Sequence, residues 1–209
     1  MALARDGADV VAIDADAALL ARARAALRGE SASVRERLRY VQADLRSAAL
    51  GELFEPPSTV DRVVMAHSVL FCFTLEELRA LLPKLRACLA PDGVLLFDTY
   101  PTDAFHAQGD PDEVDDWGEV ARVHVEGEDY SVMERSDWDR DAQRLRAHYR
   151  YERDGHEALW ATIEHHYRLS HEVEALLEEA GFSDILISGD FAGGPFREDA
   201  VAMVVAASR

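Results

Sequence analysis

The chain has 209 residues, with 22 Lys and Arg against 40 Asp and Glu, which gives a formal net charge of −18. A chain of this size can bury a sizeable core within one domain. So strong a negative charge repels phosphate backbones and argues against nucleic-acid binding. Uncharged apolar runs fall short of the roughly 20 residues that cross a bilayer, and the first residues lack a signal-peptide pattern. We therefore expect a cytoplasmic protein with no membrane partner.

The two cysteines, Cys72 and Cys88, do not form a disulfide framework or a paired zinc motif. We predict that both are buried small apolar residues, and we predict no metal site.

Short β-branched runs alternate with helical patterns in the first half of the chain. Residues 9–13 are predicted to form a strand that ends at Asp14, and apolar residues at helical spacing follow it. Further strands are predicted at residues 38–42 and 60–66, and the second of these ends at His67.

A helix with clear start signals comes next. Thr74 and Glu77 form a capping box, and leucines at helical spacing supply the buried stripe. A fourth strand, residues 94–97, ends at Asp98. Strands separated by helices indicate an α/β fold with a Rossmann-like open sheet, mostly parallel, which binds ligands at the carboxyl ends of its strands. The sequence therefore predicts one polar neighbourhood at these ends, made of Asp14, Asp44, His67, Ser68, Asp98, Thr99 and Tyr100.

The second half of the chain has a different pattern. Acidic residues crowd the segment after Pro101, where we expect a lid, and four alternating segments then predict an inserted antiparallel β meander. A helix from Ser170 leads to two strands near residues 185–187 and 201–206. The glycine-rich segment between those strands is too short for a crossover helix, so we predict a C-terminal antiparallel hairpin. We divide the chain into three segments, residues 1–100, 101–169 and 170–209.

Five segments, each weak alone, together carry a family resemblance over the whole chain. They are Val10 to Asp14 with the helix that follows, Gln42 to Leu45, Asp61 to His67, Leu85 to Gly93, and Tyr167 to Ser170 before a helix closed by Ala180, Gly181 and Phe182. In order and spacing they resemble the class I S-adenosylmethionine-dependent methyltransferases, in their small-molecule branch. The resemblance implies that S-adenosyl-L-methionine is the cofactor and that a methyl group passes to N or O of a small molecule. Residues 1–100 and 170–209 would form the cofactor-binding α/β domain, and 101–169 would cover the acceptor pocket.

The resemblance implies cofactor contacts at two strand ends. Asp14, with Ala15 beside it, would accept hydrogen bonds from both ribose hydroxyls, and the alternative for Asp14 is an ordinary helix cap. Asp44 would accept from the adenine amino group while the Leu45 backbone N–H faces the ring, and the alternative for Asp44 is a cap or loop carboxylate.

The resemblance places Ala66 and His67 beside the methionine part of the cofactor and the transferring methyl group. His67 is also a candidate general base, because imidazole titrates near working pH, and the alternative is a histidine held by the loop. Strand alternation puts His165 and His166 on opposite faces of the last meander strand, so one of them should face the pocket. We take His166 as the catalytic candidate.

In this family a strand and a glycine-rich loop precede the strand that contains Val10, and those glycines let backbone N–H groups approach the cofactor. Only about nine residues precede it here. We expect the chain to be a fragment of a working enzyme, or to receive the missing strand from elsewhere, or to have lost cofactor binding, and we expect a possible homodimer through open strand edges. The alternative to an enzyme is a methyltransferase-derived binding or scaffold subunit. The acidic balance favours a cationic or neutral acceptor such as an amine.

Overall fold

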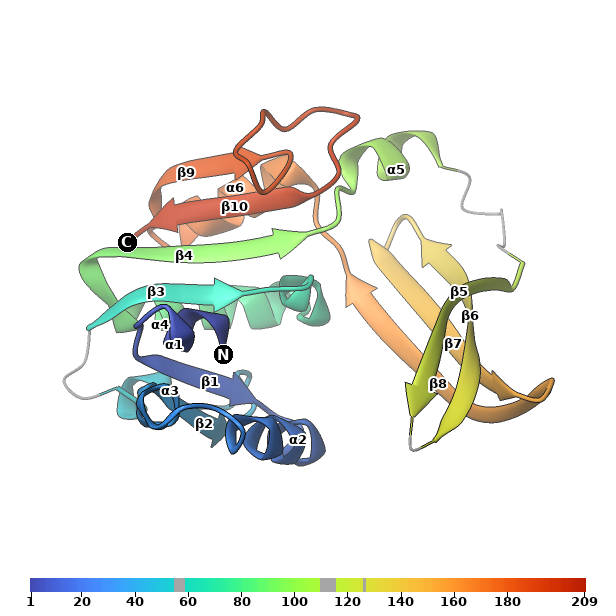
Figure 1. Cartoon of the computed structure of the whole chain (residues 1–209). Helices are drawn as coiled ribbons and strands as arrows, with labels where there is room; N and C mark the ends of the chain where they lie inside the picture. Colours follow the sequence, from blue (N-terminus) through green and yellow to red (C-terminus); the bar gives the residue numbers. More distant parts are fainter. Residues whose placement is uncertain (55–58, 110–115, 126) are drawn as a thin grey trace. The chain divides into compact units, whose positions relative to one another are not determined.

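The computed structural model describes residues 1–54, 59–109, 116–125 and 127–209 (Figure 1). The chain divides into two compact units, Met1–Leu53 and Phe54–Arg209, so the unit boundary falls inside the predicted segment that spans residues 1–100. Residues 110–115 of the predicted acidic lid lie outside the described residues. The mixture of helices with parallel and antiparallel strands confirms the predicted α/β class.

The first unit is built on a pair of parallel strands. Val10 lies opposite Leu38 and Asp14 opposite Gln42, so both strands end at the same edge. The elements are α1 (Ala2–Arg5), β1 (Val10–Asp14), α2 (Ala17–Leu27), α3 (Ala32–Arg37), β2 (Leu38–Gln42) and the 3-10 turn η1 (Leu50–Glu52). A small apolar core joins α1, α3 and the two strands through Ala4, Val34 and Leu38, with Val10, Ala12, Leu27 and Tyr40 packed against it.

The start of α2 resolves the alternative reading of Asp14 as a helix cap. The residue that caps this helix is Asp16, whose side chain accepts hydrogen bonds from the backbone N–H groups of Ala18 at 2.6 Å and Leu19 at 3.1 Å. A side-chain oxygen in this position satisfies N–H groups that have no partner within the helix. Asp14 is therefore not the cap, and its carboxylate lies before the helix, at the strand end.

The second unit contains two four-stranded sheets, in the orders β3-β4-β10-β9 and β5-β6-β7-β8. In the first sheet β3 is parallel to β4, whereas β10 is antiparallel to both β4 and β9. The elements of the second unit are β3 (Val60–Met65), the 3-10 turn η2 (Val69–Cys72), α4 (Leu75–Cys88), β4 (Leu89–Thr99), α5 (Asp103–Gln108), β5 (Gly118–Val125), β6 (Glu128–Asp139), β7 (Arg144–Arg153), β8 (His156–His166), α6 (Ser170–Glu179), β9 (Ser183–Ser188) and β10 (Met203–Ser208).

Helix α4 confirms the predicted start signals. The Thr74 backbone N–H donates to Glu77 Oε2 at 2.8 Å, and the Glu77 N–H donates back to Thr74 Oγ1 at 3.2 Å. The helix continues through Pro83. Burial of each large apolar side chain of this helix stabilises the fold by about 1.5–3 kcal/mol. This value is an upper bound, because denatured chains already bury part of their apolar surface. The buried side chains of the helix are Leu78, Leu81, Leu82, Leu85 and Cys88.

The antiparallel sheet β5-β6-β7-β8 has two chemically different faces, set by strand alternation and by the observed register. We call one the apolar face; besides the polar Glu134 and Ser136, it carries Val132, Trp138, Leu145, Ala147, Tyr149, Tyr151, Leu159, Ala161, Ile163 and His165. We call the other the charged face; besides the apolar Met133, it carries Arg135, Asp137, Asp139, Arg144, Arg146, His148, Arg150, Trp160, Thr162, Glu164 and His166.

Hydrogen bonds within the second unit tie the chain after β4 to the chain after β8. The fully buried Thr102 donates its hydroxyl to the Arg168 carbonyl oxygen at 2.7 Å. Asp103 accepts from the Ser170 hydroxyl at 2.7 Å and from the Ser170 backbone N–H at 3.1 Å. These bonds place the end of β8 and the start of α6 beside the carboxyl end of β4.

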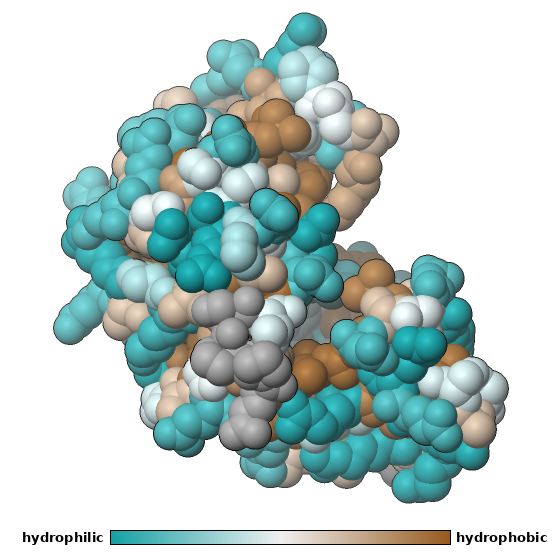
Figure 2. All heavy atoms as spheres, turned by 90° about the vertical axis from the view of Figure 1, so that its left-hand side faces the viewer, coloured by the Kyte–Doolittle hydropathy of each residue, from teal (hydrophilic) through white to brown (hydrophobic). Residues whose placement is uncertain are grey.

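The face in Figure 2 is mostly hydrophilic, in keeping with the abundance of Asp and Glu. Cys88 is buried as predicted, but the prediction for Cys72 is wrong, because it lies exposed in η2. Among the described residues, no helix combines the length and apolar character needed to cross a membrane.

Candidate functional site

In the first unit, the carboxyl ends of β1 and β2 lie side by side. The Ala43 backbone N–H donates to the Asp14 carbonyl oxygen at 3.0 Å, and the Gln42 side-chain amide donates to the Ala15 carbonyl oxygen at 3.3 Å. One carboxylate oxygen of Asp14 accepts the Asp16 backbone N–H at 2.8 Å. Among the described residues none donates to the other oxygen, Oδ2. Asp14 is therefore a half-buried carboxylate with one oxygen engaged in the turn and one open to a ligand donor.

Asp44 follows the end of β2 in an exposed turn. Its Oδ1 accepts from the Arg46 backbone N–H at 2.9 Å and lies 3.4 Å from the Arg46 guanidinium. Its carbonyl oxygen accepts from the Ala48 N–H at 2.8 Å, which closes the turn. Leu45 beside it is half-buried. The predicted pair Asp14 and Asp44 thus meets at neighbouring strand ends of the first unit.

In the second unit, the chain leaves β3 through a strained turn. His67 has φ 60° and Ser68 has φ 57°, a left-handed conformation that is uncommon for residues with a side chain. Asp98 holds this turn, because its carboxylate accepts the His67 backbone N–H at 3.2 Å and its carbonyl oxygen accepts the Ser68 N–H at 3.0 Å. The His67 side chain is exposed, and Ala66 before it is half-buried. No described residue hydrogen-bonds the His67 imidazole.

The carboxyl end of β4 carries an aromatic cluster of Phe71, Tyr100 and His165. Tyr100 Oη lies 3.2 Å from His165 Nδ1, and the two rings stack with centroids 5.7 Å apart. The fully buried Phe71 meets Tyr100 edge-on at 5.1 Å. Burial raises the pKa of the Tyr100 hydroxyl far above that of an ordinary phenol, and burial lowers the pKa of His165. Both groups are therefore uncharged at neutral pH.

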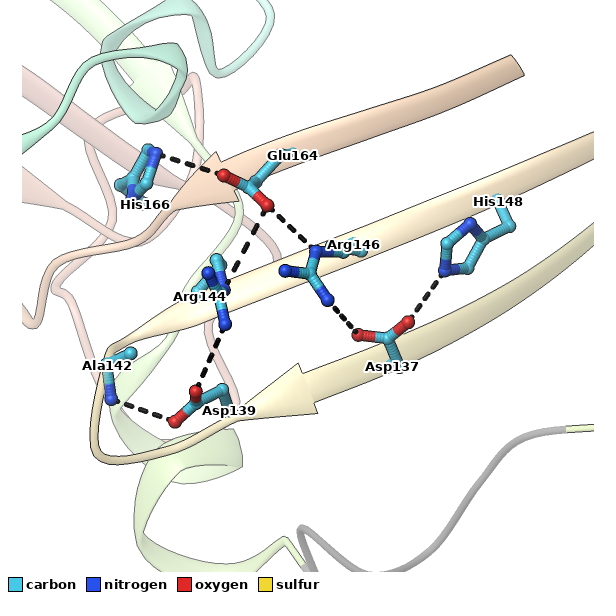
Figure 3. A network of polar contacts seen from close by, with 8 residues as sticks. All are labelled: Asp137, Asp139, Ala142, Arg144, Arg146, His148, Glu164 and His166. Atoms are coloured by element: carbon cyan, nitrogen blue, oxygen red, sulfur yellow. Dashed lines mark hydrogen bonds and ion pairs between the residues drawn. The ribbon is translucent and has the colours of Figure 1, made fainter.

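The predicted catalytic candidate His166 lies on the charged face, opposite His165. Its Nε2 is 3.5 Å from Glu164, as Figure 3 shows. Glu164 also accepts from Arg146 at 2.8 Å, and Arg146 lies 3.6 Å from Asp137. Of the two adjacent histidines, His165 is the one that reaches the end of β4.

The charged face is a network of paired side chains (Figure 3). Asp137 lies 2.7 Å from His148 Nε2, and the other ring nitrogen of His148 is 3.0 Å from Thr162 Oγ1. Trp117 is covered by the guanidinium groups of Arg135 at 5.3 Å and Arg150 at 4.6 Å. Asp137, His148, Arg146 and Glu164 pair with one another, whereas Arg135 Nε is buried without a hydrogen-bond partner among the described residues.

A cavity of about 250 Å³ opens in the second unit immediately after Tyr100. Asp103 and Ser170 in its wall are hydrogen-bonded to each other. Its lining residues are Pro101, Asp103, Ala104, Ser170, Phe196, Arg197 and Glu198.

The sequence analysis named Tyr100 but missed its partnership with His165. Alternation had already separated His165 from His166, yet it carried no information on which face turns toward β4. A signal was present, because the face of His165 also carries Ala161 and Ile163, whereas that of His166 carries Thr162 and Glu164. An apolar face packs against other elements more often than a charged one.

Comparison with known proteins shows which family and which solved structures this chain is similar to. Residues 1–93 match the family model described as "Methyltransferase domain". Comparison with curated protein sequences gives no match. The CcbJ methyltransferase from Streptomyces caelestis superposes with a TM-score of 0.78 at 18% identity, over 98% of this chain and 76% of that one. Residues 1–93 therefore match a methyltransferase domain, and the chain as a whole has the fold of a solved methyltransferase.

Two further solved methyltransferases show the same fold. CalS10, an amino pentose methyltransferase from Micromonospora echinaspora, has a TM-score of 0.63 at 20% identity, over 96% of this chain and 73% of that one. The glycopeptide N-methyltransferase MtfA has a TM-score of 0.60 at 20% identity, over 99% of this chain and 76% of that one. These matches cover the meander as well as the α/β part, so this chain shares the methyltransferase fold over nearly its whole length. The cofactor of the class is S-adenosylmethionine.

Proposed function

We propose that this methyltransferase transfers a methyl group from S-adenosylmethionine to a nitrogen or oxygen atom of a small molecule. The observation that carries the proposal is the pair Asp14 and Asp44 at neighbouring carboxyl ends of β1 and β2. α/β sheets bind their ligands at such ends. The open Oδ2 of Asp14 fits a ribose hydroxyl, which is a hydrogen-bond donor.

We propose the following roles for the predicted residues. Asp14 accepts from the ribose, with the Ala15 backbone beside it. Asp44 accepts from the adenine amino group, and Leu45 faces the ring. The neighbours CalS10 and MtfA, whose names give an amino pentose and a glycopeptide nitrogen as their targets, support a small-molecule acceptor.

We propose that Ala66 and His67 line the methionine end of the cofactor. The Asp98 carboxylate accepts the His67 backbone N–H and supports the left-handed turn, and the exposed His67 ring is left open to a ligand. S-adenosylmethionine supplies a methyl group on a positively charged sulfur. The protein's part is to hold the acceptor in line and to exclude water, and such positioning lowers the barrier by several kcal/mol.

The test is calorimetric titration of the 209-residue chain with S-adenosylhomocysteine. We expect micromolar binding that Asp14→Ala weakens by about 10- to 150-fold, because a hydrogen bond to a charged group contributes about 1.5–3 kcal/mol. Asp16→Ala is the matched control: it removes the α2 cap, at a cost of about 1 kcal/mol in stability, but keeps the Asp14 carboxylate. If Asp14→Ala bound as tightly as the wild type, the ribose role would be wrong. No binding by the wild-type chain would favour either a fragment of a working enzyme or the scaffold alternative.

A further inference from the structure

His165 combines an anchored ring with a free nitrogen. Its Nδ1 lies 3.2 Å from Tyr100 Oη, whereas its Nε2 has no hydrogen-bond partner among the described residues. His148, by contrast, has both ring nitrogens engaged, by Asp137 and Thr162. His166 directs its Nε2 to Glu164. A histidine held through one nitrogen and free at the other is the arrangement that lets an enzyme present a base in a fixed direction.

The surroundings of His165 keep it neutral. Phe71 and Tyr100 pack against the ring, with the Phe71 centroid 6.3 Å away. Burial lowers the pKa of His165, and the neighbouring His166 lowers it further. The titratable groups around the pair are Tyr100, directly after β4, His166 on β8, and Cys72 and Tyr167, whose charges act on Tyr100. The groups that act on the pair are not carboxylates, and Glu164, which contacts His166, lies on the opposite face of β8. We therefore infer that the site favours an uncharged acceptor over an ammonium ion.

We propose that His165 accepts the proton of a small uncharged amine through Nε2 during methyl transfer, and that Tyr100 is a positioning residue that orients the ring through Nδ1. The proposal rests on the proposed function. It also replaces His166 by His165 as the proton acceptor.

The step balances in atoms and charge. The lone pair of the acceptor nitrogen forms a bond to the methyl carbon, and the carbon–sulfur bond breaks with its electron pair going to sulfur. The nitrogen then gives one proton to His165 Nε2 and keeps the electrons of that N–H bond. The positive charge passes in this way from sulfur to the imidazolium. The Tyr100 oxygen can accept the Nδ1–H bond of that imidazolium and stabilise it.

The first test needs no acceptor. NMR of the full chain labelled with ¹⁵N-histidine reports which ring nitrogen carries the proton and where each histidine titrates. We expect His165 to carry its proton on Nδ1, to have no proton on Nε2, and to have a pKa below the ordinary value for histidine. Tyr100→Phe should shift that titration. The proposal would be overturned if His165 carried its proton on Nε2 at neutral pH, or if Tyr100→Phe left the titration of His165 unchanged.

The second test is turnover of labelled S-adenosylmethionine with aniline and D-glucosamine as amine probes, at a pH at which each amine is largely uncharged. We expect His165→Gln to lower kcat about 100-fold or more with unchanged S-adenosylhomocysteine affinity. Tyr100→Phe should lower kcat less and move the acid limb of the pH profile. His124→Gln, a surface change on β5, is the matched control, and His166→Gln tests the competing histidine.

The outcomes separate this proposal from the proposed function. A chain that fails to bind S-adenosylhomocysteine contradicts the proposed function. In that case the NMR result alone tests the proposed protonation of His165 and its dependence on Tyr100. A chain that binds it but methylates none of the amines contradicts the acceptor class. A larger loss of kcat in His166→Gln than in His165→Gln would show that the wrong histidine has been assigned.

Discussion

Two buried threonines near the carboxyl end of β4 offer a matched test of how this region of the fold is stabilised. Thr102 is 0% exposed and donates to the Arg168 carbonyl oxygen at 2.7 Å. Thr99 is 2% exposed, and among the described residues its hydroxyl has no hydrogen-bond partner. Valine replaces the hydroxyl of either residue by a methyl group of similar shape. The two substitutions should therefore have opposite effects.

Thr102→Val leaves the buried Arg168 carbonyl without this donor, which costs about 1–3 kcal/mol. Thr99→Val removes a buried hydroxyl that lacks a partner, so the free energy of unfolding should stay level or rise by about 1 kcal/mol. With a urea m-value of about 2 kcal/mol per molar, the midpoint of Thr102→Val should fall by about 0.5–1.5 M.

The assay is urea denaturation followed by tryptophan fluorescence. All three tryptophans, Trp117, Trp138 and Trp160, lie in the second unit, so the signal reports on that unit alone. Equal losses of stability in Thr99→Val and Thr102→Val would refute the reasoning, because the loss would then come from packing rather than from the hydrogen bond.

Two further predictions concern the second unit. A Cβ atom at Gly189 would lie 2.6 Å from the Pro195 carbonyl oxygen, so Gly189→Ala should destabilise the unit by about 1–3 kcal/mol, whereas Gly118→Ala meets nothing within 4 Å and should lower the urea midpoint far less. The pKa of His165 is lower in the folded chain than in the unfolded one. Above about pH 6.5 His165 is neutral in both states and does not change the free energy of unfolding. Below that pH the unfolded chain binds the proton more readily, so the free energy of unfolding falls as the pH drops. Urea midpoints measured between pH 7.5 and 5 should therefore fall less in His165→Gln than in the wild type, and parallel curves would contradict this.

Local signals in the sequence were enough to predict several elements. The capping box at Thr74 and Glu77 and the leucine stripe after it depend only on helical geometry, and the structure has both. The strand that ends at Asp14 and the one at residues 38–42 follow from short β-branched or apolar runs and their flanking residues. Such signals lie in residues that are close together in the chain, so they predict a helix or strand without knowledge of the tertiary structure.

Other features depended on contacts between distant segments. Alternation along β8 separated His165 from His166, but only the packing of the sheet beside β4 decides that His165 meets Tyr100, 65 residues away in sequence. The same holds for Asp98, whose backbone and side chain hold the turn at His67. The sequence by itself determined the α/β class and the type of many of its elements, because local periodicity suffices for these, but it did not predict helices α3 and α5. Only the tertiary structure decided which polar groups have partners and which stay free for a ligand, because burial and hydrogen bonding are properties of the folded chain.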